Sequence, residues 1–133
     1  DEIKADGTYD NLLKGFIDTP EDQRGSYITG EQVGTKGTLT MATNAAFPPF
    51  EYLLDDSKTV AGLDIEIAKL IAKKADMTLN VINMDFDSLL MALENGSADF
   101  VIAGMTVTEE RLLSVDFSDS YYTSTQAIIV KAD

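Results

Sequence analysis

Residues 98–111, ADFVIAGMTVTEER, contain the local pattern that decides the fold of this chain. The apolar run at 100–103 (FVIA) is typical of a strand that is covered on both faces of a sheet. Residues 104–107 (GMTV) do not continue this apolar run. The sequence TEE at 108–110 is typical of the first turn of a helix. A buried strand, a short loop and a helix in this order predict one unit of an α/β fold.

Strands and helices alternate along the rest of the chain from residue 38 onward. Further strands are predicted at 39–43 (LTMAT), 79–83 (LNVIN) and 127–130 (AIIV). Helices are predicted from Leu63 to near Asp76, and after Asp87 as an N-cap. The two prolines in FPPF at 47–50 end the first strand because they lack N–H donors, and a hairpin-like turn is predicted at 55–58. The expected fold class is α/β, with a mostly parallel sheet flanked by helices and joined by right-handed crossovers.

A separate helix is predicted within residues 1–17. Behind Thr8 as an N-cap, apolar side chains recur at helical spacing, namely Tyr9, Leu12, Leu13, Phe16 and Ile17. Residues 18–37 hold a proline, several glycines and many polar residues, so they are expected to be a linker. The expected organisation is therefore a helix at 1–17, a linker at 18–37 and one domain at 38–133.

Composition excludes several classes of function. Ten Lys and Arg face 23 Asp and Glu among 133 residues, and the net charge of −13 disfavours a nucleic acid or an anionic membrane as the main partner. The chain has no Cys and no His, which excludes disulfides, thiol nucleophiles, Ser-His-Asp triads and imidazole zinc sites. No EF-hand spacing is present, and we expect no metal site and no cofactor.

Candidate site residues follow the carboxyl ends of the predicted strands, where open α/β sheets bind their ligands. These candidates are Asn44, Phe47, Phe86, Gly104, Thr106 and Arg111. Arg111 is the sharpest signal, because a cation near the third position of a helix is disfavoured by the helix dipole. It would either clamp a carboxylate with its planar guanidinium or form an ordinary salt bridge to Asp116 or Asp119.

Each of the other candidates also has a purely structural interpretation. Phe47 and Phe86 would wall a pocket or fill the core. Gly104 would let a ligand approach the backbone, or would simply make a turn. Thr106 would donate a hydrogen bond to a ligand or cap a helix, and Asn44 would contact a ligand or shape its turn.

From about residue 37 to 133 the chain resembles the first lobe of an amino-acid-binding protein of ABC importers. This is solute-binding protein family 3, with the type II periplasmic-binding-protein fold, in its glutamine, arginine and histidine branch. The matching segments stand in the expected order: ATNAAFPPFE at 42–51, GLDIEIA at 62–68, MDF at 84–86, ADFVIAGMTVTEER at 98–111 and VDFSDSYY at 115–122.

The resemblance implies roles for the candidate residues. Arg111 would grip the α-carboxylate of the ligand, and Gly104 and Thr106 would bind its ammonium and carboxylate groups. Phe47 and Phe86 would sandwich the ligand side chain. The position of Asn44 often carries Asp in the family, so this departure bears on side-chain selectivity.

Complete members of the family have two lobes, whereas the match here stops where the family crosses to the second lobe. Residues 1–13 resemble the C-terminal segment of the same family, which suggests a tandem-domain piece, a permuted protein or an isolated half. The implied partners are a small-molecule amino acid, a second lobe and an ABC permease in the parent protein. A homodimer, domain-swapped through the first helix, is a further expectation. The implied location is periplasmic or extracellular and associated with the cell surface.

We therefore expect a non-enzymatic amino-acid receptor lobe whose binding alone is weak. Three alternatives stay open at this point. One is a dehydratase-type enzyme on the same fold, for which the sequence names no catalytic acid. The others are the sensing domain of a receptor or transporter fusion, and an assembly module that dimerises through the exposed cleft face.

Overall fold

The computed structural model describes residues 2–132. Its centre is a three-stranded parallel sheet with the strand order β5-β1-β6. The strands are β1 (Thr38–Thr43), β5 (Thr78–Asn83) and β6 (Phe100–Val101). The parallel sheet and the α/β class expected from the sequence are therefore confirmed. β6 is two residues shorter than the apolar run at 100–103 predicts, because its pairing with β1 stops at Val101.

β1 is the middle strand, and its partners bring distant parts of the chain to one edge. It pairs with β5 along its whole length, from Thr38 opposite Thr78 to Thr43 opposite Asn83. On its other side it pairs with β6 only at Met41 and Ala42, which are both fully buried. The loops that leave the carboxyl ends of all three strands therefore emerge at the same edge of the sheet.

A small antiparallel sheet follows β1 in the chain. It consists of β2 (Ala46–Phe47), β3 (Glu51–Leu53) and β4 (Val60–Ala61). The turn between β3 and β4 is the hairpin expected at 55–58, and Asp56 stabilises it by accepting hydrogen bonds from Lys58 and Thr59. The strand before FPPF ends at Thr43, as the two prolines predict.

Helices follow β4 and β5. α3 (Leu63–Ala75) matches the predicted helix and ends at Asp76, which adopts a left-handed conformation. A 3-10 turn, η2 (Phe86–Ser88), leads into α4 (Leu89–Glu94), and Gly96 takes the left-handed conformation expected after the helix. Asp87 lies inside η2 and is not the N-cap, so that prediction is wrong: the 3-10 turn puts Ser88 at the N-cap position, and α4 begins at Leu89.

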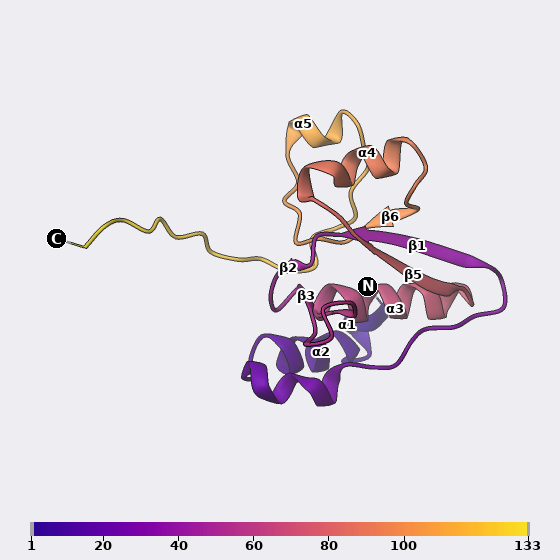
Figure 1. Cartoon of the computed structure of the whole chain (residues 1–133), viewed down its shortest axis with the longest axis horizontal. Helices are drawn as coiled ribbons and strands as arrows, with labels where there is room; N and C mark the ends of the chain where they lie inside the picture. The colour runs from indigo at the N-terminus through magenta and orange to yellow at the C-terminus, as the bar shows by residue number, and fades with distance from the viewer. Residues whose placement is uncertain (1, 133) are drawn as a thin grey trace.

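The segment after β6 contains α5 (Glu109–Leu112), and Thr108 caps it by accepting a hydrogen bond from the Arg111 N–H. The strand predicted at 127–130 does not form. Ile128 and Ile129 are 92% and 97% exposed, and Figure 1 shows this part of the chain leading away from the body of the molecule. A strand needs a partner for its backbone groups, and within residues 2–132 this segment meets none.

Three helical elements precede the sheet. They are α1 (Glu2–Ala5), α2 (Thr8–Phe16) and the 3-10 helix η1 (Glu21–Tyr27). The helix expected behind Thr8 is α2, and the additional short helix α1 precedes it. Gly7 separates the two with a φ of +83°, which is in the left-handed region. Thr8 is the first residue of α2 and not its N-cap, and its N–H donates to the Asp6 carboxylate.

Residues 28–37, within the expected linker, are held on the domain. The backbone N–H and the hydroxyl of Thr29 donate to Glu66 of α3, and Lys36 N–H donates to the carbonyl of Asp76. Leu79 N–H of β5 donates back to the carbonyl of Gln32. The connection is therefore ordered, and whether residues 1–17 and 38–133 are separable units stays a prediction.

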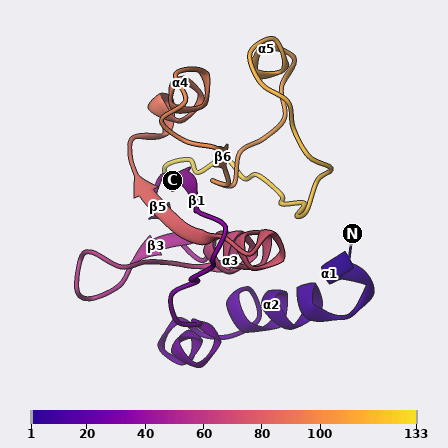
Figure 2. The same cartoon turned by 90° about the vertical axis from the view of Figure 1, so that its right-hand side faces the viewer.

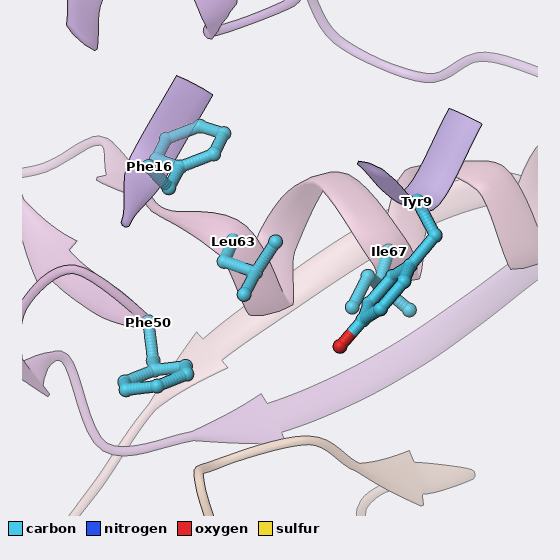
Figure 3. Packing of buried hydrophobic residues seen from close by; sticks show 5 residues of the cluster. All are labelled: Tyr9, Phe16, Phe50, Leu63 and Ile67. Carbon is cyan, nitrogen blue, oxygen red and sulfur yellow. The ribbon is translucent and has the colours of Figure 1, made fainter. Parts of the chain in front are cut away.

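The elements stack in layers (Figures 1 and 2). α4 and α5 lie on one side of the parallel sheet and α3 lies on the other, with the N-terminal helices beyond α3. Figure 3 shows how α2 docks: Tyr9 and Phe16 face Leu63 and Ile67 of α3. All four side chains are at most 8% exposed, which confirms the predicted apolar stripe of α2. In the part of the chain described, no helix has both the length and the apolar character needed to cross a membrane.

Candidate functional site

A pocket of about 240 Å³ opens where the loops leave the carboxyl ends of β1, β5 and β6. Its lining residues are Asn44, Ala46, Phe47, Glu51, Phe86, Ala103 and Gly104. Four of the six residues expected at a site thus line one hollow, although they are separated by up to 60 positions in the chain. Parallel pairing causes this convergence, because it aligns the three strand ends.

Arg111 does not line this pocket but lies next to it, against the ring of Phe86. Its guanidinium carbon is 5.4 Å from the centre of the Phe86 ring, and its Nη1 donates to the carbonyl of Thr106 over 2.7 Å. The side chain is half-buried, and among residues 2–132 it forms no ion pair with an acid. The alternative of a salt bridge to Asp116 or Asp119 is therefore absent from the described residues, and most of the guanidinium N–H groups remain available.

Thr106 is placed by the same contact. Its carbonyl accepts from Arg111, and its side chain is exposed beside the pocket. Thr108, two residues on, uses one lone pair of its hydroxyl to cap α5. Among residues 2–132, the Thr106 hydroxyl makes no hydrogen bond, and Arg111 uses only one of its guanidinium N–H groups in this loop.

Phe47 and Phe50 differ in their roles although both belong to FPPF. Phe47 is 52% exposed and lines the pocket, whereas Phe50 is 8% exposed and lies in the core. The two rings stack with centroids 5.3 Å apart, and Phe50 meets the Tyr122 ring edge-on at 5.1 Å. The core thus supports the exposed ring from behind.

Gly104 forms the part of the pocket where a side chain would be strained and crowded. Its φ is +54°, and a Cβ at this position would lie 3.0 Å from two carbons of the Phe47 ring. Its N–H donates to Asp64 over 2.9 Å, so this donor is not available to a ligand. The Gly104 carbonyl receives no hydrogen bond within residues 2–132.

Asn44 joins two of the loops. Its Nδ2 donates to the carbonyl of Met84 over 2.8 Å, while the neighbouring Ala45 N–H donates to Asn83. The amide therefore shapes the turn, as one interpretation of the sequence expected, and it also lines the pocket.

A buried acidic cluster that was not predicted from the sequence lies next to the pocket. Glu51 and Asp64 are 1% and 0% exposed, and the hydroxyl of Tyr121 donates to both oxygens of Asp64 at 2.9 Å. One available signal was that each acid interrupts an apolar stretch, FEYL at 50–53 and LDI at 63–65. A carboxyl at such a position must be buried with partners or must be neutral.

The two carboxyls are close enough to perturb each other. Burial and then the adjacent Asp64 carboxylate raise the pKa of Glu51 to about 10. Burial also raises the pKa of Asp64, while hydrogen bonds from its neighbours oppose that rise. Burial and the negative charge of Asp64 raise the pKa of Tyr121. Burial beside Asp64 therefore favours the protonated, neutral form of the Glu51 carboxyl.

A second hollow, of about 380 Å³, lies between α2, residues 29–32 and α3. Its buried acid, Glu66, already accepts from Thr29 and from Lys69, so it offers no unsatisfied group. Across residues 2–132, no three acidic side chains are grouped in a way that could hold a metal ion. The pocket beside Arg111 is therefore the candidate site.

Comparison with known proteins gives one family. The sequence model of the bacterial extracellular solute-binding proteins, family 3, matches residues 39–133. The arginine-binding extracellular protein ArtP of Bacillus subtilis (strain 168) is 46% identical over 109 residues, which are 82% of this chain and 42% of ArtP.

Two solved structures show the same relationship in three dimensions. An ancestral arginine-binding protein bound to arginine superposes with a TM-score of 0.62 and 48% identity, over 65% of this chain and 38% of that one. The arginine-bound form of domain 1 of TmArgBP superposes with a TM-score of 0.61 and 39% identity, over 63% of this chain and 66% of that one. The chain spans less than half the length of the curated relatives that it matches.

Proposed function

We propose, since the chain belongs to family 3 of the bacterial extracellular solute-binding proteins, that it binds a free polar amino acid at the pocket beside Arg111. One observation carries this proposal. In an acidic protein, the Arg111 guanidinium is stacked on Phe86 at the pocket wall and has no acidic partner among the residues described. A planar guanidinium with free N–H groups is suited to a carboxylate, which it can bind through two parallel hydrogen bonds.

The other groups at the pocket complement an amino acid. Phe47 offers an exposed ring face on one side, and Phe86 offers another beneath Arg111. The Gly104 carbonyl can accept from the α-ammonium, and the Thr106 hydroxyl can donate to the α-carboxylate. Each of these roles is part of the proposal, and the whole set depends on the carboxylate clamp.

A cationic side chain is the ligand type that the pocket favours. Ring faces attract cations, the Glu51 carboxyl at the pocket can accept hydrogen bonds from a cationic group, and the net charge of −13 attracts a positive ligand over a distance. The relatives named for arginine support the same class. We therefore propose arginine as the first ligand to test, with Asn44 in place of the family's frequent Asp as a source of altered selectivity.

In a complete protein this lobe would act with a second one. The ligand would be enclosed by hinge closure between the lobes, and the closed form would deliver it to an ABC permease. The family description supports an extracellular or periplasmic location, and attachment to the cell surface remains an expectation. The described N-terminal helices pack on α3 of their own chain, so a domain-swapped dimer stays a prediction.

One lobe by itself is expected to bind weakly, because it supplies only one side of a site that two lobes would enclose. The arginine-bound single domain of TmArgBP supports binding by one lobe. Calorimetry with arginine, histidine, glutamine and glutamate tests the proposal directly. Absence of heat with all four, together with unchanged amide resonances in NMR spectra, would refute it.

Replacing Arg111 tests the clamp. Arg111→Ala should weaken arginine binding roughly ten- to hundredfold, because it removes charged hydrogen bonds to the carboxylate. Arg111→Lys should recover only part of the loss, since an ammonium lacks the planar fork.

The matched control is Arg24→Ala. Arg24 is the only other arginine in the sequence, and it also donates to a backbone carbonyl, that of Thr19. This variant should bind like the original chain. Equal affinity of the Arg111 and Arg24 variants would remove the clamp from the site.

We propose binding and not catalysis, although Glu51 supplies the acid that the sequence did not reveal. A neutral carboxyl beside the pocket is the kind of group a dehydratase would need. Incubation with prephenate should give no phenylpyruvate absorbance. If the original chain forms phenylpyruvate and Glu51→Gln does not, the result would favour an enzyme over a binding protein.

A further inference from the structure

We propose that Glu51 holds a proton while the pocket is empty and releases it when the cationic side chain of an amino acid enters. This inference rests on the proposed function and adds a selection rule to it: a cationic ligand is exchanged for a proton, and a neutral ligand of the same shape is not.

Glu51 is buried at the edge of the pocket. It comes from β3, lines the pocket with Phe47 and Gly104, and is 1% exposed. Its Oε1 lies 3.8 Å from the point where a Cβ at Gly104 would stand. The carboxyl therefore lies close to Gly104, where a ligand in the pocket could reach it.

Glu51 has a second acid beside it and no paired cation among residues 2–132. Asp64 of α3 faces it, and Tyr121 reaches the same cluster from the C-terminal segment. The ion pairs within residues 2–132 are Lys69 with Glu66 and Lys74 with Glu2, so neither buried acid has a cation. Arg111 is held at the pocket wall by Thr106 and Phe86.

The hydrogen-bond donors near Glu51 are used by Asp64. The two donors in the cluster, the Gly104 N–H and the Tyr121 hydroxyl, both donate to Asp64. Oε2 of Glu51 is buried and has no donor. An ionised Glu51 would thus be an unpaired buried charge opposite a second carboxylate, whereas a proton lets Glu51 donate to Asp64.

A cationic side chain in the pocket would favour the ionised form of Glu51 over the protonated form. Its charge and its N–H donors would compensate an ionised Glu51, and the proton of Glu51 would leave to water, so that one positive charge replaces another. Because protons compete with the ligand, affinity for arginine should rise with pH by up to about tenfold per pH unit while Glu51 is protonated in the free chain. Affinity for citrulline, the neutral analogue of arginine, should not change.

The first test examines the free protein. At neutral pH the infrared spectrum should show the carbonyl stretch of a buried protonated carboxyl, and Glu51→Gln should remove this band. Glu94→Gln, at an exposed position, is the matched control and should leave the band in place. Absence of the band, or its persistence in Glu51→Gln, would overturn the assignment of the proton to Glu51.

The second test counts protons. Calorimetric titration in two buffers with different heats of ionisation should show release of about one proton per arginine and none per citrulline. In Glu51→Gln, arginine should bind at least roughly tenfold more weakly without proton release, and citrulline should bind as before. If this variant does not fold, the comparison of the two ligands on the original chain still decides.

The outcomes separate this inference from the proposed function. Arginine that binds without releasing a proton overturns the exchange and leaves amino-acid binding intact. A chain that binds neither ligand contradicts the proposed function and the exchange together.

Discussion

At the residue scale, Asp64 connects three segments that meet behind the pocket. Its carboxylate accepts from the Gly104 N–H in the loop after β6 and from the Tyr121 hydroxyl in the C-terminal segment, while Asp64 itself stands in the first turn of α3. One buried side chain thus holds the glycine of the pocket and the following chain in place. These hydrogen bonds are made to a carboxyl that is fully buried, where hydrogen bonds to a charged group stabilise the fold more than they would at the surface.

Removal of the Tyr121 hydroxyl should destabilise the chain. Tyr121→Phe should lower the free energy of unfolding by about 1.5–3 kcal/mol, since it removes a hydrogen bond to a buried charged group. Urea denaturation measures the change. Tyr122→Phe is the control: the Tyr122 ring packs on Phe50, its hydroxyl makes no hydrogen bond within residues 2–132, and a change within about 0.5 kcal/mol is expected.

The raised pKa of Glu51 predicts how stability depends on pH. Its pKa is about 10 in the folded chain against an ordinary value of 4.5, so the folded chain keeps a proton that the unfolded chain loses. The stabilisation is fully present below pH 4.5 and is lost as the pH rises toward 10, with a slope of at most about 1.4 kcal/mol per pH unit.

Glu51→Gln should remove this contribution. Between pH 5 and 9, the unfolding free energy of the original chain should fall relative to that of the variant, as urea denaturation at each pH will show. Glu94→Gln should follow the original chain. Parallel curves for Glu51→Gln and the original chain would mean that Glu51 is ionised in the fold.

At the element scale, α2 is stabilised by its docking on α3. A nine-residue helix is marginal in water, and α2 buries Tyr9 and Phe16 against Leu63 and Ile67 (Figure 3). Phe16→Ala should lower the free energy of unfolding by about 3–5 kcal/mol, because a fully buried ring leaves a cavity.

Val33→Ala is the control for this experiment, because Val33 is 71% exposed and a change within about 0.5 kcal/mol is expected. Chemical denaturation and the amide NMR spectrum of α2 measure both variants. A small effect of Phe16→Ala would mean that the N-terminal helices contribute little to the folded domain.

At the scale of the whole molecule, like charges repel throughout a small acidic chain. A net charge of −13 opposes compaction, so added salt should increase the free energy of unfolding by screening this repulsion. Urea denaturation in 20 mM and 500 mM NaCl measures the response, and KCl should give the same result.

A variant with exposed Glu31, Glu94 and Asp119 replaced by their amides loses three negative charges and should respond less to salt. A larger response of this variant, or destabilisation of the original chain by salt, would contradict the account based on repulsion. The same field favours a cationic ligand, which connects this property to the proposed function.

Strong local patterns predicted the frame of the molecule. The helical stripe of α2, the boundaries of α3 and the parallel pairing of β1 with β5 all follow from periodicity and alternation. Predictions failed where an element depends on contacts with distant parts of the chain. The apolar run at 127–130 is typical of a strand, but within residues 2–132 it pairs with no sheet edge. The short helix α1 was not expected, and left-handed Gly7 separates it from α2.

The candidate site divides in the same way. From its own composition and order, the sequence determined the α/β frame, the loops at the strand ends, and an arginine in a helix turn that disfavours cations. Only the tertiary structure decided that Arg111 stacks on Phe86 without an acid, and that Glu51 and Asp64 share one buried space. The reason is physical: backbone geometry repeats locally and leaves a pattern in sequence, whereas burial and charge depend on groups that are distant along the chain.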